Sequence, residues 1–259
     1  LYEASDQCFE PVSIQQEYLG YLERIHPFVT ETPVLVHSLV EQGRRLLFEG
    51  AQGTFLDIDH GTYPFVTSSN TVSGNACAGG GIGPRHISDV VGIVKAYTTR
   101  VGSGPFPTEL LDQTGEFLRS EGQEFGATTG RPRRCGWFDA VLVRYAVRLN
   151  GITSLALTKL DVLDKLETLK LCVGYRMKDG CIQADFPFEG HDDDDPVFEE
   201  LPGWNTKTAG ITEYEQLPKN LIDYLARIEE LVEAPASIIS TGPKREDTIV
   251  LQPDEFWKS

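Results

Sequence analysis

Apolar residues recur every three or four positions in three segments, which predicts amphipathic helices. The first is residues 13–26, where a serine followed three positions later by a glutamine is typical of a capping box. The second follows Asp139, a residue type that caps helices, and closes at Gly151. The third is residues 218–233, and residues 87–96 predict a shorter helix. The positions expected to face inward are Ile14, Tyr18, Leu22 and Ile25; Val141, Leu142, Tyr145, Ala146 and Leu149; and Leu221, Tyr224, Leu225, Ile228 and Leu231.

Short apolar runs bounded by turn residues predict strands. They are residues 46–50, 97–101, 153–158, 168–176, which alternate like a hairpin strand, and 236–240. Residues 51–86 and 122–136 are rich in small and polar residues with little periodicity, and such long loops are usually functional. Residues 185–205 contain four consecutive aspartates and indicate an acidic surface excursion without a metal site. Alternating strands and helices predict an α/β sheet with functional loops at the strand ends.

Composition narrows the function. The 259 residues are 40% hydrophobic, enough for a substantial core, and 23 Lys+Arg against 39 Asp+Glu give a net charge of −16. This charge argues against a nucleic-acid binder or a partner of anionic membranes, but it leaves room for a local anion pocket. No stretch predicts a transmembrane helix or secretion signal, so we expect a cytoplasmic protein. The five scattered cysteines predict neither a zinc site nor a disulfide framework.

Two strand ends carry residues suited to a purine base. Thr158-Lys159-Leu160-Asp161 offers a carboxylate that can accept from both N1–H and the 2-amino group of guanine, and a lysine stem that can lie along the base. The spacing imitates the Asn-Lys-x-Asp element of GTPases, although four such residues also arise by chance. Ser240-Thr241-Gly242 could supply backbone groups to the other side of the base. A third strand end, Glu49 to Gly53, is more simply an ordinary tight turn.

An arginine-rich loop predicts an anion site. The segment from Gly126 to Arg134 places three arginines within four residues of an acidic chain. Arginine forks match carboxylate and phosphate groups, and the neighbouring threonines and glycine-flanked amides add neutral donors. A solvated basic turn is the alternative.

Two further observations limit the chemistry. Asp57, Asp59 and His60 are residue types that ligate metals, but no second cluster accompanies them, so a hydrogen-bonded loop core is favoured. The sequence contains neither GxxxxGK[ST] nor GxGxxG, and a GTP site without a phosphate loop is incomplete.

Taken together, the motifs resemble one family. EGAQGTFLDIDHGTYPFVTSSNT, VGSGPFPTE, EFGATTGRPRRCGWFD, LTKLDVLD and IISTGP occur in this order, from about residue 46 onward. They resemble the adenylosuccinate synthetases, which join IMP and L-aspartate using GTP and magnesium. The resemblance implies a P-loop-NTPase-like α/β fold with a large, mostly parallel central sheet and flanking helices, in a homodimer. Residues 1–45 fit less distinctively.

The resemblance also implies ligand contacts by position. IMP would be bound by Gln52, Thr67, Val101 and Arg131; L-aspartate by Ala127, Thr128, Thr129, Gly130, Arg131, Pro132 and Arg133; and GTP by Arg133, Lys159, Leu160, Asp161, Ser240, Thr241 and Gly242. Gln52 would help orient the activated base, and Thr129 and Arg131 would hold the carboxylates of aspartate. Ser73, Asn75 and Ala78 stand where relatives more often carry alanine, glycine and threonine, and they receive no ligand role.

Part of the family pattern is not found here. Its N-terminal region carries the phosphate loop, the base aspartate, the acid histidine, the magnesium ligand and the interface arginines. The chain begins at Leu1 with its one methionine at Met177. We therefore expect residues 1–259 to be the C-terminal portion of a single synthetase domain, without metal ligands and inactive alone. The alternative is a guanine-nucleotide-binding module without ligase activity. A GTPase-like regulator would leave the arginine loop unexplained.

Overall fold

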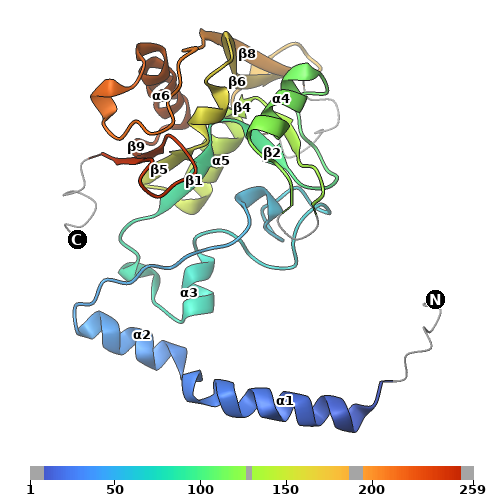
Figure 1. The fold of residues 1–259 in the computed structure, drawn as a ribbon, viewed down its shortest axis with the longest axis vertical. Coiled ribbons are helices and arrows are strands. Elements are labelled where there is room, and N and C mark those ends of the chain that lie inside the picture. Colours follow the sequence, from blue (N-terminus) through green and yellow to red (C-terminus); the bar gives the residue numbers. More distant parts are fainter. Residues whose placement is uncertain (1–8, 127–129, 187–194, 252–259) are drawn as a thin grey trace. The chain divides into compact units, whose positions relative to one another are not determined.

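The computed structural model describes residues 9–126, 130–186 and 195–251. The chain forms two compact units (Figure 1). The N-terminal unit comprises the residues up to Phe48 together with Ala76–Gly83, and the sheet unit comprises Glu49–Asn75 and the residues from Pro84 onward. All the candidate ligand residues that the structure describes belong to the sheet unit. No helix in the described ranges has the length and apolarity needed to cross a membrane.

The main sheet has the strand order β1-β5-β9-β10. Its strands are β1 (Val91–Lys95), β5 (Ser154–Thr158), β9 (Ala236–Ser240) and β10 (Thr248–Val250). The first three are parallel neighbours, and β10 runs antiparallel to β9. Leu155 and Leu157 of β5 are fully buried because β5 lies between two strands within the core. This arrangement confirms the predicted α/β fold with a mostly parallel sheet.

A second sheet is built around β6 (Thr168–Arg176), which pairs with β4, β7 and β8. The bounds of its partners are β4 Phe138–Asp139, β7 Ile182–Gln183 and β8 Asp195–Pro202. A separate two-stranded ribbon joins β2 (Thr98–Arg100) to β3 (Arg134–Gly136). The ribbon is relevant to the candidate anion site, because β3 begins at Arg134, the last residue of the arginine-rich loop.

One helix of the sheet unit follows its predicted capping signals at both ends. α5 (Ala140–Asn150) begins where the Asp139 carboxylate accepts the backbone N–H of Leu142, and it ends at Gly151 with φ 61°. A positive φ favours glycine, so both predicted ends are confirmed. α6 (Lys219–Val232) is likewise confirmed and packs against α5. The other helices are α1 Pro11–Ile25, α2 Thr32–Glu41, α3 Asn75–Gly80 and α4 Gln113–Glu121, with 3-10 turns at His26–Phe28, Thr54–Leu56, Pro84–His86, Leu160–Leu163 and Tyr214–Gln216.

Two predictions of secondary structure, one of a helix and one of a strand, need correction. Residues 87–96, predicted as a helix, contain β1 instead, because the β-branched run beside Gly92 pairs along its length with β5. Residues 46–50, predicted as a strand, have no regular structure, and the Leu47 side chain is 93% exposed. An apolar run without a partner strand does not form a sheet.

One other local prediction was wrong, and one segment contains a strand that was not predicted. The first helix starts at Pro11, with proline in its first turn and no side-chain cap, so Ser13 and Gln16 lie inside the helix instead of forming a capping box. In the acidic segment 185–205, residues 195–202 are strand β8, paired antiparallel with β6. Residues 187–194 of that segment lie outside the described residues.

Candidate functional site

The predicted guanine-binding residues gather at one edge of the main sheet. Lys159 directly follows β5 and Thr241 directly follows β9, and these parallel strands are neighbours, so their carboxyl ends meet. The backbone N–H of Ala96, after β1, donates to the Thr158 carbonyl at 2.8 Å and continues this edge. In an open α/β sheet this edge is the usual ligand site.

Side-chain environment separates the roles available to these residues. Leu160 and Thr241 are fully buried, and the Thr241 hydroxyl donates to the Ile211 carbonyl at 2.8 Å. Both can therefore offer a base only backbone groups. A Cβ at Gly242 would lie 2.5 Å from Asp247 Oδ2, so this turn requires glycine. Asp161 is half-buried, and its burial raises the pKa of the carboxyl group.

The arginine-rich loop is the tip of a short hairpin. The Arg133 N–H donates to the Glu124 carbonyl and the Gly126 N–H to the Arg131 carbonyl, each at 2.8 Å. Phe125 and Pro132 form an antiparallel bridge between these two pairs. Ala127, Thr128 and Thr129 lie outside the described residues, whereas Gly130 has a φ of 63°, a conformation suited to glycine in a tight tip. The four described residues of the predicted aspartate loop, Gly130 to Arg133, thus belong to a hydrogen-bonded hairpin base.

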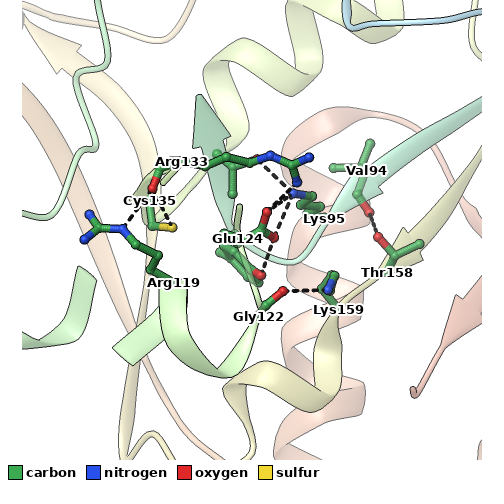
Figure 2. A network of polar contacts seen from close by, with 11 residues as sticks. Val94, Lys95, Arg119, Gly122, Glu124, Arg133, Cys135, Thr158 and Lys159 are labelled. Atoms are coloured by element: carbon green, nitrogen blue, oxygen red, sulfur yellow. Dashed lines mark hydrogen bonds and ion pairs between the residues drawn. The ribbon is translucent and has the colours of Figure 1, made fainter. Parts of the chain in front are cut away.

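At the base of this hairpin lies a buried carboxylate that sequence reasoning missed (Figure 2). Glu124 has no exposed surface, and it accepts hydrogen bonds from Lys95 Nζ at 2.8 Å, Tyr97 Oη at 2.7 Å and Arg133 Nη1 at 2.7 Å. Burial alone would raise the pKa of Glu124, but these three donors outweigh it and lower the pKa. Burial also lowers the pKa of Lys95. Glu124 and Lys95 therefore form an ion pair at the base of the candidate aspartate loop.

Lys159 links the guanine edge to the same hairpin. Its backbone is left-handed, with φ 65°, and its Nζ donates to the Gly122 carbonyl at 2.8 Å. Gly122 lies two residues before Glu124, at the end of α4. The only sequence signal for this network was an isolated glutamate beside a Gly/Thr/Arg-rich loop, which by itself indicates nothing specific.

Arg134 does not belong to the anion pocket that the run of arginines suggested. Its guanidinium pairs with both carboxylate oxygens of Glu109 and also donates to the Gly104 carbonyl at 2.8 Å. It lies on β3, and its partner Glu109 is a different carboxylate from Glu124, the partner of Arg133. Its role is to hold the loop that follows Val101.

Two of the candidate IMP residues, Thr67 and Val101, lie beside loops that Arg100 joins. Arg100 Nη2 donates to the Thr62 hydroxyl at 2.9 Å and to the Phe65 carbonyl at 3.2 Å, while Nε donates to the Ser103 carbonyl at 3.0 Å. Thr67 follows the first of these loops and Val101 precedes the second, so the arginine ties their segments together. Gln52 is exposed at a left-handed position, with φ 64°.

Asp57 forms the hydrogen-bonded loop core that the sequence favoured over a metal site. Its buried carboxylate accepts four backbone N–H groups, those of Asp59, His60, Thr71 and Val72. Burial raises its pKa, but the four donors outweigh that effect and lower the pKa to about 2. Within the described ranges, no group of three His, Cys, Asp or Glu could hold a metal ion.

Comparison with known proteins gives this site a context. The profile of the adenylosuccinate synthetase family matches residues 1–249. Adenylosuccinate synthetases of Carboxydothermus hydrogenoformans and Nitrosomonas eutropha are 57% and 58% identical over 240 residues, which cover 92% of this chain and 56% of each relative. The structure of the fully ligated enzyme of Plasmodium falciparum is 37% identical, with a TM-score of 0.91 over 95% of this chain and 59% of that one.

The matches also correct one expectation about the N-terminal residues. The match to the family profile begins at residue 1, so the similarity includes residues 1–45, where short motifs alone were not distinctive. The chain spans just over half the length of the curated relatives it matches. On this evidence, the chain belongs to the adenylosuccinate synthetase family.

Proposed function

We propose that this chain supplies the base- and aspartate-recognising part of a ligase that forms adenylosuccinate from IMP and L-aspartate, with hydrolysis of GTP to GDP and phosphate. This reaction is the first committed step from IMP to AMP. The oxygen at position 6 of a purine is a poor leaving group, and transfer of the GTP γ-phosphoryl group to it creates a good one. The amine of aspartate then displaces phosphate. Family membership and the shared sheet edge support the proposal.

GTP recognition is assigned to the carboxyl ends of β5 and β9. Asp161 accepts from the N1–H and 2-amino group of guanine, while Lys159 and Leu160 border the base. Ser240, Thr241 and Gly242 border its other side through backbone groups. The observation that carries this assignment is the adjacency of two parallel strands ending in these two motifs. Adenine lacks the paired donors, so the same carboxylate selects guanine.

Aspartate recognition is assigned to the hairpin tip, Ala127 to Arg133. Thr129 and Arg131 bind the two carboxylates of aspartate, because a guanidinium fork matches a carboxylate bidentately. Arg133 contributes positive charge beside the transferring phosphoryl group, where such charge lowers the barrier. IMP is assigned to Gln52, Thr67, Val101 and Arg131.

The rest of the assignment concerns the whole protein. Family members use magnesium with GTP, but the described residues offer no cluster suited to that ion, so its ligands are not assigned to this chain. We also assign the whole protein to the cytoplasm as a homodimer. The 259 residues alone are expected to be inactive, because no phosphate-binding loop occurs in this sequence. The alternative, a guanine-nucleotide-binding module without ligase activity, draws on the same sheet edge.

A turnover assay tests the proposal. The whole protein carrying these residues should convert IMP, L-aspartate and GTP to adenylosuccinate, followed by its absorbance, while the 259-residue chain should not. Turnover by the isolated chain would refute the expected inactivity. Tight GTP binding without any turnover by the whole protein would favour the binding module.

Two substitutions in the whole protein separate the ligands. Asp161→Asn removes the bidentate acceptor and should reduce the preference for GTP over ITP by about 10-fold or more, with the KM for aspartate little changed. Arg131→Leu should raise the KM for aspartate by about 100-fold, with the KM for GTP little changed. Each variant is the control for the other, and an identical effect of both on all substrates would contradict the assignment.

A further inference from the structure

A buried, ionised Glu124 needs an explanation beyond the fold. A carboxylate taken out of water is costly unless charged and polar partners surround it. Here its partners come from two places: Lys95 and Tyr97 lie at the connection from β1 to β2, and Arg133 lies on the far arm of the hairpin. The Glu124 side chain therefore joins that connection to both arms of the hairpin.

Arg133 is held at two levels. Its backbone is fixed on both sides, since its N–H donates to the Glu124 carbonyl at 2.8 Å and its carbonyl accepts from Arg119 Nε at 3.0 Å. Its guanidinium is fixed through Nη1, and among the described residues no other side chain bonds it. A planar guanidinium anchored at one corner keeps a defined direction for its remaining donors. About a third of the Arg133 side chain remains exposed, so those donors can reach a ligand.

The same carboxylate moderates a cluster of positive charge. Lys95 and Arg133 bond it, Lys159 bonds the nearby Gly122 carbonyl, and the repulsion of Lys95 by Arg133 and Lys159 lowers the Lys95 pKa further. Glu124 offsets part of this repulsion while leaving the cluster net positive. A cluster that Glu124 holds together, and that keeps a net positive charge, suits an anionic ligand.

We infer that Glu124 is a positioning residue: it fixes the Arg133 guanidinium and the base of the aspartate hairpin, and through Lys95 it ties both to the sheet edge that carries the guanine motifs (Figure 2). This inference rests on the function proposed for the hairpin. Lys159 adds a second tie from that edge, to the Gly122 carbonyl. Glu124 itself touches no substrate and acts through Arg133.

The kinetic test uses the whole protein. Glu124→Gln keeps the size and one acceptor oxygen but removes the charge. It should raise the KM values for aspartate and GTP by about 10-fold or more and the KM for IMP by less, because only Arg131 of the four residues assigned to IMP lies on the hairpin. Glu124→Asp should recover part of the loss. Glu199→Gln is the matched control, because it makes the same change in an Arg–Glu pair between β8 and α6 and should leave these KM values unchanged.

A double-substitution cycle asks whether Glu124 acts through Arg133. In an Arg133→Met background, Glu124→Gln should have less than about a twofold further effect on KM, because the group it positions is gone. Fully additive effects, or an equal rise in KM for all three substrates, would overturn the inference.

Hydrogen exchange on the 259-residue chain tests the anchoring independently of catalysis. In Glu124→Gln the amides of Gly126 and Arg133 should exchange about 10-fold faster, while those of β5 remain unchanged. Unchanged exchange at both hairpin amides would overturn the anchoring role. If the whole protein fails to turn over its substrates, the proposed function fails, and the exchange result still decides whether Glu124 holds the hairpin.

Discussion

Helices α1 and α6 have similar amphipathic patterns but opposite surroundings. The expected inner face of α6 is buried, with Leu221, Tyr224, Leu225 and Ile228 at most 2% exposed. The expected inner face of α1 is open in the described part of the chain, with Ile14, Tyr18, Leu22 and Ile25 between 42% and 66% exposed. Periodicity therefore predicts a helix and its apolar face, but burial also depends on a partner surface. Because burial differs, an apolar substitution should lower the stability of the chain most in α6 and least in α1.

The largest effect is expected in α6. Ile228→Ala removes a fully buried side chain from the core that α6 shares with the main sheet. It should lower the free energy of unfolding by about 2–5 kcal/mol, because the core cannot fully close the cavity. Urea denaturation of the 259-residue chain measures this. A loss as small as that of a surface substitution would mean that this core is loosely packed.

An intermediate effect is expected at Asp57, which is held by hydrogen bonds instead of apolar packing. Asp57→Asn places an NH₂ group against backbone donors and should cost about 1–3 kcal/mol. Because the folded pKa, about 2, lies below the ordinary 3.8, the stability from this group is present above pH 3.8 and is lost as pH falls through about 2. Unfolding curves between pH 5 and pH 2 should show that loss in the original chain and not in the variant.

The smallest effect is expected in α1. Leu22→Ala should change the free energy of unfolding of the 259-residue chain by less than about 0.5 kcal/mol, because this side chain is half exposed. The same urea experiment checks it. A loss near that of Ile228→Ala would break the comparison and show that a surface covers α1 in solution.

What the sequence predicted depended on whether the signal was local. Strand β9 and helices α5 and α6 were correctly predicted because the hydrophobic pattern, and for α5 also the capping residues, act within a few positions. Strand β1 was missed, since its state is decided by pairing with β5, some sixty residues along the chain. Residues 46–50, which include Leu47, were wrongly predicted as a strand, because their apolar run has no partner strand.

The same distinction applies to the site. Lys159 to Asp161 and Ser240 to Gly242 were identified from short motifs, and the parallel pairing of their strands brings them to one edge. Glu124 could not be identified, because its meaning comes from Lys95, which lies 29 residues away in sequence. Arg134 looked equivalent to Arg133 in the sequence, yet its partner is Glu109. The two neighbouring arginines differ in the glutamate that each pairs with, and composition does not reveal that pairing.

The left-handed backbone of Lys159 has a consequence for engineering this protein. A non-glycine residue at φ 65° carries about 1 kcal/mol of conformational strain, which glycine would relieve. Replacing the lysine would also remove its bond to Gly122 and its proposed contact with guanine. The strain that glycine would relieve is therefore offset by the loss of this bond, and the proposed function needs the lysine as well. Position 159 combines a strained backbone with contacts that only a long side chain can make.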